Sequence, residues 1–131
     1  MAKHSAPAIY PTLRYDDAPA AIRFLTEAFG FRADAVHEEQ GRVSHALLGW
    51  GNGLVMLSSR RPADPFDLGQ CCLYVAVDDP DAHHARAKAA GAHILMPLAD
   101  QHYGSREYAA RDPEGNIWCF GTYRPGREPE A

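Results

Sequence analysis

The sequence lacks any apolar run close to the ~18 residues that a membrane-spanning helix requires. Its first residues, Met-Ala-Lys-His-Ser-Ala-Pro-Ala, contain no apolar stretch typical of a signal peptide. Cysteine is scarce: Cys71, Cys72 and Cys119 are the 3 present. An odd number of cysteines without a secretion signal favours free thiols in a reducing compartment. We therefore expect a cytoplasmic protein with no membrane partner.

A clustered basic segment is also missing. The formal net charge is −4, and the 13 lysines and arginines are scattered along the chain, whereas nucleic-acid binding requires a concentrated basic surface. Hydrophobic residues make up 46% and charged residues 23% of the sequence, which is typical of a folded globular protein and excludes disorder over the whole length. We expect one domain, spanning residues 1–131, and no nucleic-acid partner.

Two halves of the sequence repeat one pattern. An apolar stretch ends in a pair of aspartates, at Asp17 or Asp79, and a helical stretch follows that ends at Gly30 or Gly91. The second copy lies about 60 residues after the first, close to half of the chain. Aspartate is a favourable N-cap, and glycine is a favourable C-terminal cap. The repeat therefore indicates two copies of one strand–helix unit.

Short apolar stretches bounded by turn residues predict the remaining strands. After first strands at 9–15 and 71–77, we predict strands at 31–38, 42–50 and 54–59 in one copy and at 93–96, 105–111 and 116–122 in the other. The predicted fold is α+β, with two βαβββ modules in tandem at 8–59 and 71–123. A linker at 60–70 joins the modules, and a frayed tail follows at 124–131. Helices would cover one face of each mixed sheet, and the other faces would form a cleft.

Residue spacing also predicts which side chains face inward. The second helix offers a slim apolar face, so we expect Ala82, Ala85 and Ala89 to pack on the sheet, with His83 and His84 exposed.

In the last strand, Trp118 and Phe120 fall on the opposite face from Cys119, and we assign both aromatic residues to the core. Tyr74 shares a strand face with Cys72.

The run from 103 to 123, Tyr-Gly-Ser-Arg-Glu-Tyr-Ala-Ala-Arg-Asp-Pro-Glu-Gly-Asn-Ile-Trp-Cys-Phe-Gly-Thr-Tyr, resembles the vicinal oxygen chelate superfamily. This superfamily includes glyoxalase I, bleomycin resistance proteins and extradiol dioxygenases. The resemblance covers residues 9–123 and includes both halves of the repeat. It implies a metal site built from four strand positions, which carry histidine or glutamine and glutamate in the enzymes.

In this sequence those four positions correspond to Tyr10, Met56, Cys72 and Cys119. Catalytic divalent ions favour imidazole and carboxylate ligands, and none remains in this quartet. The chain thus resembles a glyoxalase-like subgroup without the usual metal ligands, and we expect no metal and no cofactor. A soft-ion site formed by Met56, Cys72 and Cys119 is an open alternative.

Several further side chains are candidates to face the cleft. Glu107 would do so in the register of glyoxalase-like relatives, while a slip of one residue would substitute Arg106 and Tyr108. His45 is a candidate to form a hydrogen bond with a ligand. Trp50 is a candidate to offer an aromatic face to a planar ligand. The predicted ligand-binding set is Tyr10, Arg14, His45, Met56, Cys72, Tyr74, Tyr103, Arg106, Glu107 and Cys119.

These positions are apolar, aromatic and lightly polar, which suits a site that buries an organic molecule. The resemblance implies metal-independent sequestration of a hydrophobic or aromatic compound, such as an antibiotic or another secondary metabolite, by a homodimer with a pair of grooves. The alternative function is a glyoxalase-like lyase or isomerase in which Glu107, His45 or Cys72 carries protons. Activation of Cys72 would need a nearby positive group, for which Arg14 is the candidate.

Overall fold

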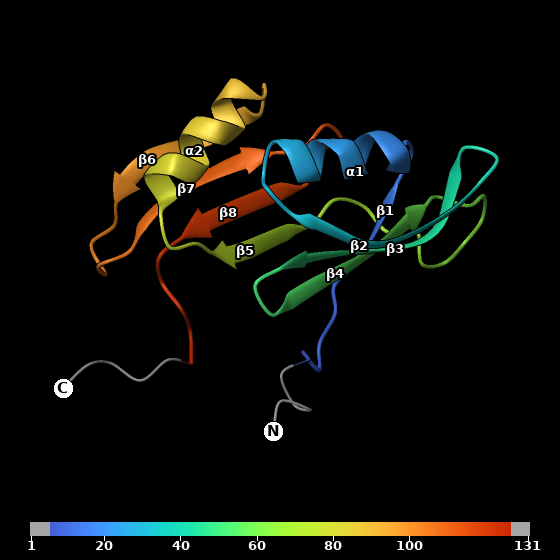
Figure 1. Cartoon of the computed structure of the whole chain (residues 1–131), viewed down its shortest axis with the longest axis horizontal. Helices are drawn as coiled ribbons and strands as arrows, with labels where there is room; N and C mark the ends of the chain where they lie inside the picture. Colours follow the sequence, from blue (N-terminus) through green and yellow to red (C-terminus); the bar gives the residue numbers. More distant parts are fainter. Residues whose placement is uncertain (1–5, 127–131) are drawn as a thin grey trace.

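The computed structural model describes residues 6–126. Each half of this range contains one helix and four strands, in the order strand, helix and three strands (Figure 1). The elements of the first half are β1 Thr12–Tyr15, α1 Ala18–Glu27, β2 Arg32–Glu39, β3 Arg42–Trp50 and β4 Gly53–Ser59. Those of the second half are β5 Cys72–Ala76, α2 Pro80–Ala89, β6 His93–Asp100, β7 Arg106–Arg111 and β8 Ile117–Gly121.

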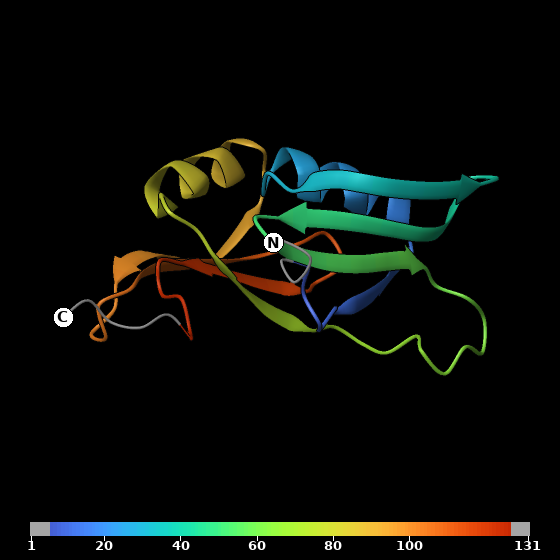
Figure 2. The same ribbon diagram turned by 60° about the horizontal axis from the view of Figure 1, so that its bottom comes forward.

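The strands form two four-stranded mixed sheets with the same topology. The strand orders are β1-β4-β3-β2 and β5-β8-β7-β6. In each sheet the first strand pairs in parallel with the last strand of its module, and the other pairs are antiparallel. Both helices lie on the same side of the sheets (Figure 2). The predicted α+β fold with tandem βαβββ modules is therefore confirmed.

The same local signals begin and end the two helices. The Asp17 carboxylate accepts a hydrogen bond from the backbone N–H of Ala20, and Asp79 accepts one from Ala82, each at 3.1 Å. A proline occupies the first turn of each helix, where its missing N–H has no helical partner to lose. Gly30, with φ +80°, follows α1 in the left-handed region that suits a helix C-terminus.

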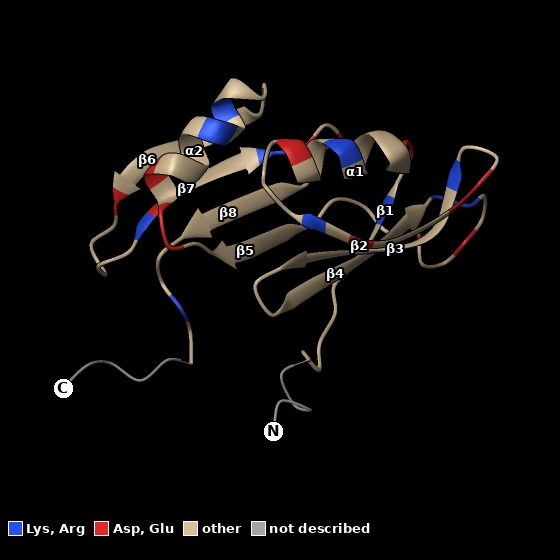
Figure 3. Ribbon diagram, in the orientation of Figure 1, with Lys and Arg blue, Asp and Glu red and all other residues tan. Residues whose placement is uncertain are grey.

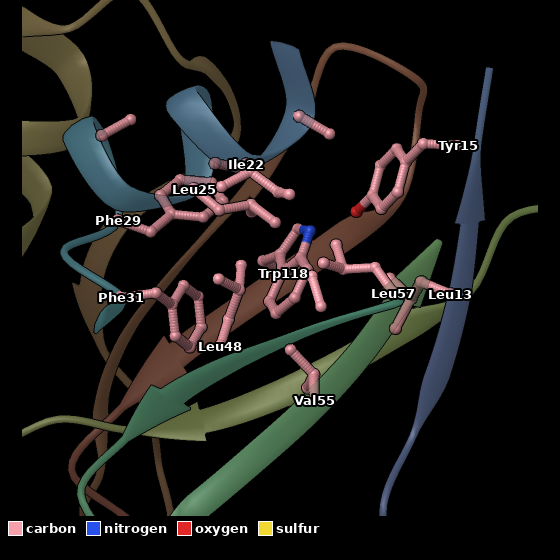
Figure 4. Packing of buried hydrophobic residues seen from close by; sticks show 14 of the residues in the cluster. Leu13, Tyr15, Ile22, Leu25, Phe29, Phe31, Leu48, Val55, Leu57 and Trp118 are labelled. Carbon is pink, nitrogen blue, oxygen red and sulfur yellow. The ribbon is translucent and has the colours of Figure 1, made fainter. Parts of the chain in front are cut away.

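One hydrophobic core spans both modules. Trp118 of β8 is fully buried, and its ring centroid lies 5.3 Å from that of Phe31 and 5.9 Å from that of Phe29. Leu48, Leu57 and other first-module side chains surround the same indole (Figure 4). Phe120 is also fully buried, so the predicted core positions of Trp118 and Phe120 are confirmed.

Directed polar contacts also join the modules. The Tyr15 hydroxyl donates to Oδ2 of buried Asp112 at 2.6 Å. The Trp50 indole N–H donates to the carbonyl of Ala76 at 2.9 Å. Arg86 of α2 donates to two carbonyl oxygens at the end of α1, those of Thr26 and Glu27. Because these bonds need precise geometry, they fix how the two modules sit against each other.

The predicted inner face of α2 is wrong. Ala82, Ala85 and Ala89 are exposed, whereas Pro80, His83 and Ala87 are buried. His83 is 8% exposed, and both of its ring nitrogens have partners inside the molecule. Nδ1 lies 2.6 Å from the Tyr108 hydroxyl, and Nε2 lies 2.8 Å from the Phe29 carbonyl oxygen. These partners compensate for burying a polar ring.

Two strand boundaries differ from prediction by three residues or more. β1 begins at Thr12, after Pro11, rather than at residue 9. β6 continues to Asp100 rather than ending at 96, with register shifts on both sides of Met96. Pro97 is tolerated there because β6 is an edge strand. Of the predicted tail at 124–131, residues 127–131 lie outside the described range.

No helix within residues 6–126 combines the length and the hydropathy needed to cross a membrane.

Candidate functional site

The face of the second sheet that points away from the helices carries several reactive side chains. Tyr74 of β5 is paired in register with Cys119 of β8, and Glu107 of β7 is paired with Gly121. Paired residues point to the same face of a sheet. Tyr74, Glu107 and Cys119 therefore share one face, which we call the open face of the second sheet.

Cys72 and Cys119 lie together on this open face. Their Sγ atoms are 4.0 Å apart, and Cys72 is exposed. Burial, reinforced by the neighbouring Cys72, raises the pKa of the Cys119 thiol to about 11. Cys119 is therefore a protonated thiol at neutral pH, which is the opposite of the lowered pKa that activates a cysteine nucleophile.

Glu107 and two tyrosines converge beside the thiols. The Glu107 side chain is 7% exposed, and its Oε1 accepts a hydrogen bond of 2.7 Å from the Tyr103 hydroxyl. This bond is the main cause that raises the pKa of Tyr103 to about 12. Gly121 leaves the necessary space, since a Cβ there would lie 2.4 Å from Glu107 Cγ and 2.8 Å from the Tyr74 hydroxyl. Of the two registers left open by the sequence, the observed one turns Glu107 to the open face and Arg106 and Tyr108 to the helix side.

A groove of about 640 Å³ runs between the two modules. Its floor is apolar and aromatic, and the strands around it, β4, β5 and β8, carry no charged side chain (Figure 3). Arg32, Asp78 and Arg124 lie at its margin, with Arg124 paired to Asp78 at 2.9 Å. The accessible apolar and aromatic side chains of the groove include Trp50, Leu54, Leu73, Tyr74 and Val75, and the buried residues beneath them are Phe31, Leu48, Val55 and Trp118.

Tyr74 connects the groove to the open face of the second sheet. It lines the groove, and its hydroxyl also lies within reach of the Glu107 side chain above Gly121. Of the ten predicted ligand-binding residues, Tyr74 is the one that belongs to both regions. The other members of the set on the open face of the second sheet are Cys72, Glu107 and Cys119, with Tyr103 reaching Glu107 from the preceding loop.

The other predicted site residues lie apart from this cluster. Arg14 is 2.8 Å from Asp67 and 3.2 Å from Asp64 in the linker, so it is not the cation that would activate Cys72. His45 is exposed, and its ring faces His37 across the β2–β3 pair. Arg106 contacts Asp81 of α2 at 2.8 Å and therefore points to the helix side of the sheet.

The four positions that correspond to the metal ligands of the superfamily enzymes are divided between the sheets. Tyr10 and Met56 belong to the first module, and Cys72 and Cys119 belong to the second. Their donor atoms include no imidazole and no carboxylate. Within residues 6–126, no group of three or more His, Cys, Asp or Glu side chains is arranged to hold a metal ion. The residues present do not fit the divalent metal centre of those enzymes.

Sequence reasoning did not identify most of the groove. Phe31 precedes β2 and belongs to the core, and Leu73 and Val75 pack against that core on the face of β5 that alternation predicts to be inside. Leu73 and Val75 reach the groove because β5 is the edge strand of its sheet and faces the β3–β4 hairpin end. The signal available in the sequence was the lack of charge in β4 and β5, combined with Trp50 beside a glycine-rich turn.

Two tandem βαβββ modules, an open sheet face and a groove between the modules are the features that define the class of this protein. The chain belongs to the Glyoxalase/Bleomycin resistance protein/Dioxygenase superfamily, whose family model matches residues 8–120. The resemblance inferred from the sequence is therefore confirmed.

The chain is similar to proteins of known structure and to further proteins by sequence. TioX from Micromonospora sp. ML1 is 33% identical, with a TM-score of 0.75 over 89% of this chain and 100% of TioX. An uncharacterized protein of Mycobacterium tuberculosis is 35% identical over 98% of this chain and 80% of its own length. Lactoylglutathione lyase from Agrobacterium tumefaciens, at 22% identity and a TM-score of 0.65 over 88% of this chain and 93% of that one, shares the fold.

Proposed function

We propose that the protein binds and sequesters a hydrophobic or aromatic small molecule in the groove between its modules, without a metal. The observation that carries this proposal is the groove itself, with its volume of about 640 Å³ and its lining of aromatic and aliphatic side chains. Pockets for drug-sized ligands generally have volumes of about 300–1,000 Å³ and a mostly apolar lining.

The aromatic residues of the groove favour a flat ligand. The ring centroids of Trp50 and Phe31 are 5.8 Å apart, at an interplanar angle of 71°. The Trp50 N–H already donates to the Ala76 carbonyl. A ring held by such contacts can contact a planar molecule without losing much conformational freedom. The charged residues at the margin, Arg32, Asp78 and Arg124, offer orienting polar contacts.

Binding is tested by thermal shift and calorimetry with a panel of neutral planar aromatic compounds. A ligand at 100 times its Kd stabilises the native state by about 2.7 kcal/mol, which is a shift of several degrees in Tm for a domain of this size. Val75→Phe, which narrows the groove, should weaken binding at least tenfold. Leu95→Phe, at an exposed position of β6 outside the groove, is the matched control. Equal binding by both variants would refute the groove as the site.

A second function, proton transfer in a glyoxalase-like lyase or isomerase, is favoured by one observation. Glu107 is a nearly buried carboxylate on an open face, with the Tyr103 hydroxyl at 2.7 Å. A positioned carboxylate can act as a general base. Product formation from a bound compound that disappears in Glu107→Gln would support this function over sequestration.

We also propose that the protein is a homodimer, since a two-fold symmetric dimer is the commonest soluble oligomer. Light scattering after size-exclusion chromatography tests this, and a monomeric mass at micromolar concentration would contradict it.

A further inference from the structure

Glu107 is a buried acid whose charge is not balanced within the described chain. Its residue exposure is 7%, and no lysine, arginine or histidine among residues 6–126 forms an ion pair with it. Arg106 is paired with Asp81 and Arg124 with Asp78. Glutamate is rarely buried without a partner, because desolvating its charge is costly.

The one strong contact to this carboxylate comes from a tyrosine. The Tyr103 hydroxyl donates to Oε1 at 2.7 Å. One hydrogen bond compensates only part of the hydration that a carboxylate loses on burial, since its two oxygens can accept about four. The second oxygen has no hydrogen-bonding partner among the described residues, so Glu107 keeps the capacity to bind a positively charged group.

Three tyrosine rings form one contiguous group, and the Tyr103 hydroxyl joins this group to the carboxylate. The ring centroid of Tyr123 is 6.5 Å from that of Tyr74 and 6.3 Å from that of Tyr103. The Tyr74 hydroxyl donates to the carbonyl of Tyr123 at 2.7 Å, which fixes the first pair. All three rings remain between 39% and 54% exposed. We call Tyr74, Tyr103, Tyr123 and Glu107 the tyrosine cage.

This combination suits an organic cation. A cation within about 6 Å of an aromatic centroid is attracted to the ring face, and the attraction grows when water is excluded. Rings whose centroids are 6.3 and 6.5 Å apart touch each other, so a cation would lie against their exposed faces beside Glu107 rather than between them. The carboxylate supplies the opposite full charge. A metal ion fits less well, because the cage offers one carboxylate and phenolic oxygens, with no group of three metal-binding side chains in the described range.

We propose that the tyrosine cage binds the positively charged nitrogen of an alkylammonium or amine group on the ligand. The proposal rests on the proposed function, because Tyr74 belongs both to the cage and to the groove that would hold the apolar part of the same molecule. The ligand class is then an aromatic or hydrophobic compound with a cationic amine arm. Sequestration requires no bond to change.

The test compares choline with its uncharged isostere, 3,3-dimethyl-1-butanol, by NMR titration of the full-length protein. The two probes differ mainly in the charge on the quaternary centre. We expect choline to shift the amide signals of Tyr74, Gly121 and Tyr123 until the shifts saturate. Its affinity should be at least tenfold higher than that of the alcohol. Equal affinities, or no saturable shift with choline, would overturn the proposal.

Variants localise the effect. Glu107→Gln keeps the shape and the hydrogen-bonding capacity of the side chain but removes its charge, and should weaken choline at least tenfold. Glu38→Gln removes a charge from an exposed position of β2 and is the matched control. Tyr103→Leu, at an exposed loop residue, should also weaken choline, and Tyr103→Phe should weaken it less because the ring remains. Unchanged choline affinity in Glu107→Gln and Tyr103→Leu would overturn the cage.

The two proposals fail in different ways. If neutral planar compounds bind and respond to Val75→Phe while choline does not bind, the cage is wrong and the groove stands. If choline binds with the expected variant effects while no planar compound binds, the groove proposal is wrong, and the cage recognises a small cation alone.

Discussion

Acidification is expected to destabilise the protein through His83. Burial lowers the pKa of this imidazole, and the positive charge of Arg86 lowers it further, while the hydrogen bond to the Phe29 carbonyl opposes the shift. Because the Phe29 carbonyl can only accept, Nε2 carries the proton of the neutral ring, and Nδ1 accepts from the Tyr108 hydroxyl. A second proton, on Nδ1, would remove that accepting position.

The sign and the size of the effect follow from proton linkage. Since the pKa of His83 is lower in the folded protein than the value of about 6.5 in an unfolded chain, the unfolded state binds more protons between those two values. The contribution of neutral His83 to stability is therefore present above about pH 6.5 and is lost as the pH falls. The loss between pH 7.5 and pH 5.5 has an upper bound of about 1.4 kcal/mol, which applies to a ring that stays neutral in the folded protein over this range.

Urea unfolding at pH 7.5 and pH 5.5 measures this term against two variants. His83→Asn removes the ionisable ring and should lose less stability on acidification than the wild type, by up to about 1.4 kcal/mol. His93→Asn, at an exposed position of β6, should lose as much as the wild type. An equal pH dependence of the wild type and His83→Asn would refute the reasoning, because it would mean that His83 has the same pKa in both states.

Three further predictions concern the module contacts and the thiols. Tyr15→Phe removes the hydroxyl bonded to buried Asp112 and should lower the free energy of unfolding by about 1.5–3 kcal/mol, measured by urea denaturation with an unchanged m-value. Gly30→Ala places a Cβ at φ +80° and 3.0 Å from Arg86 Nη1, and should cost about 1–2 kcal/mol by the same assay. Alkylation of Cys119 by iodoacetamide, followed by mass spectrometry, should accelerate with pH up to about 11, and a midpoint near 9 would contradict the burial of this thiol.

Repetition and local capping made the fold readable from the sequence. Asp17 and Asp79 were predicted to be N-caps, and each accepts the expected backbone bond. Alternation along a strand placed Trp118 in the core and Cys119 on the other face, and both placements hold. Such patterns depend on residues close in sequence, so they do not change with the way in which the two modules pack together.

The buried face of α2 could not be predicted from the sequence in the same way. A helix whose alanines and histidines have similar spacing offers two possible inner faces. The buried face was decided by partners distant in sequence, the Phe29 carbonyl and the Tyr108 hydroxyl, which satisfy His83. Likewise, β6 continues past Pro97 because its position at the sheet edge, a tertiary property, leaves the missing N–H without consequence.

By itself, the sequence determined the two modules, their caps and turns, and the side chains on the open face of the second sheet, because each depends on short-range periodicity. Only the tertiary structure decided where a ligand could be held. The groove and the tyrosine cage join residues from separate segments, such as Trp50 with Leu73 and Tyr74 with Glu107. The docking of one module against the other determines the groove, and strand register within the second sheet brings the cage together.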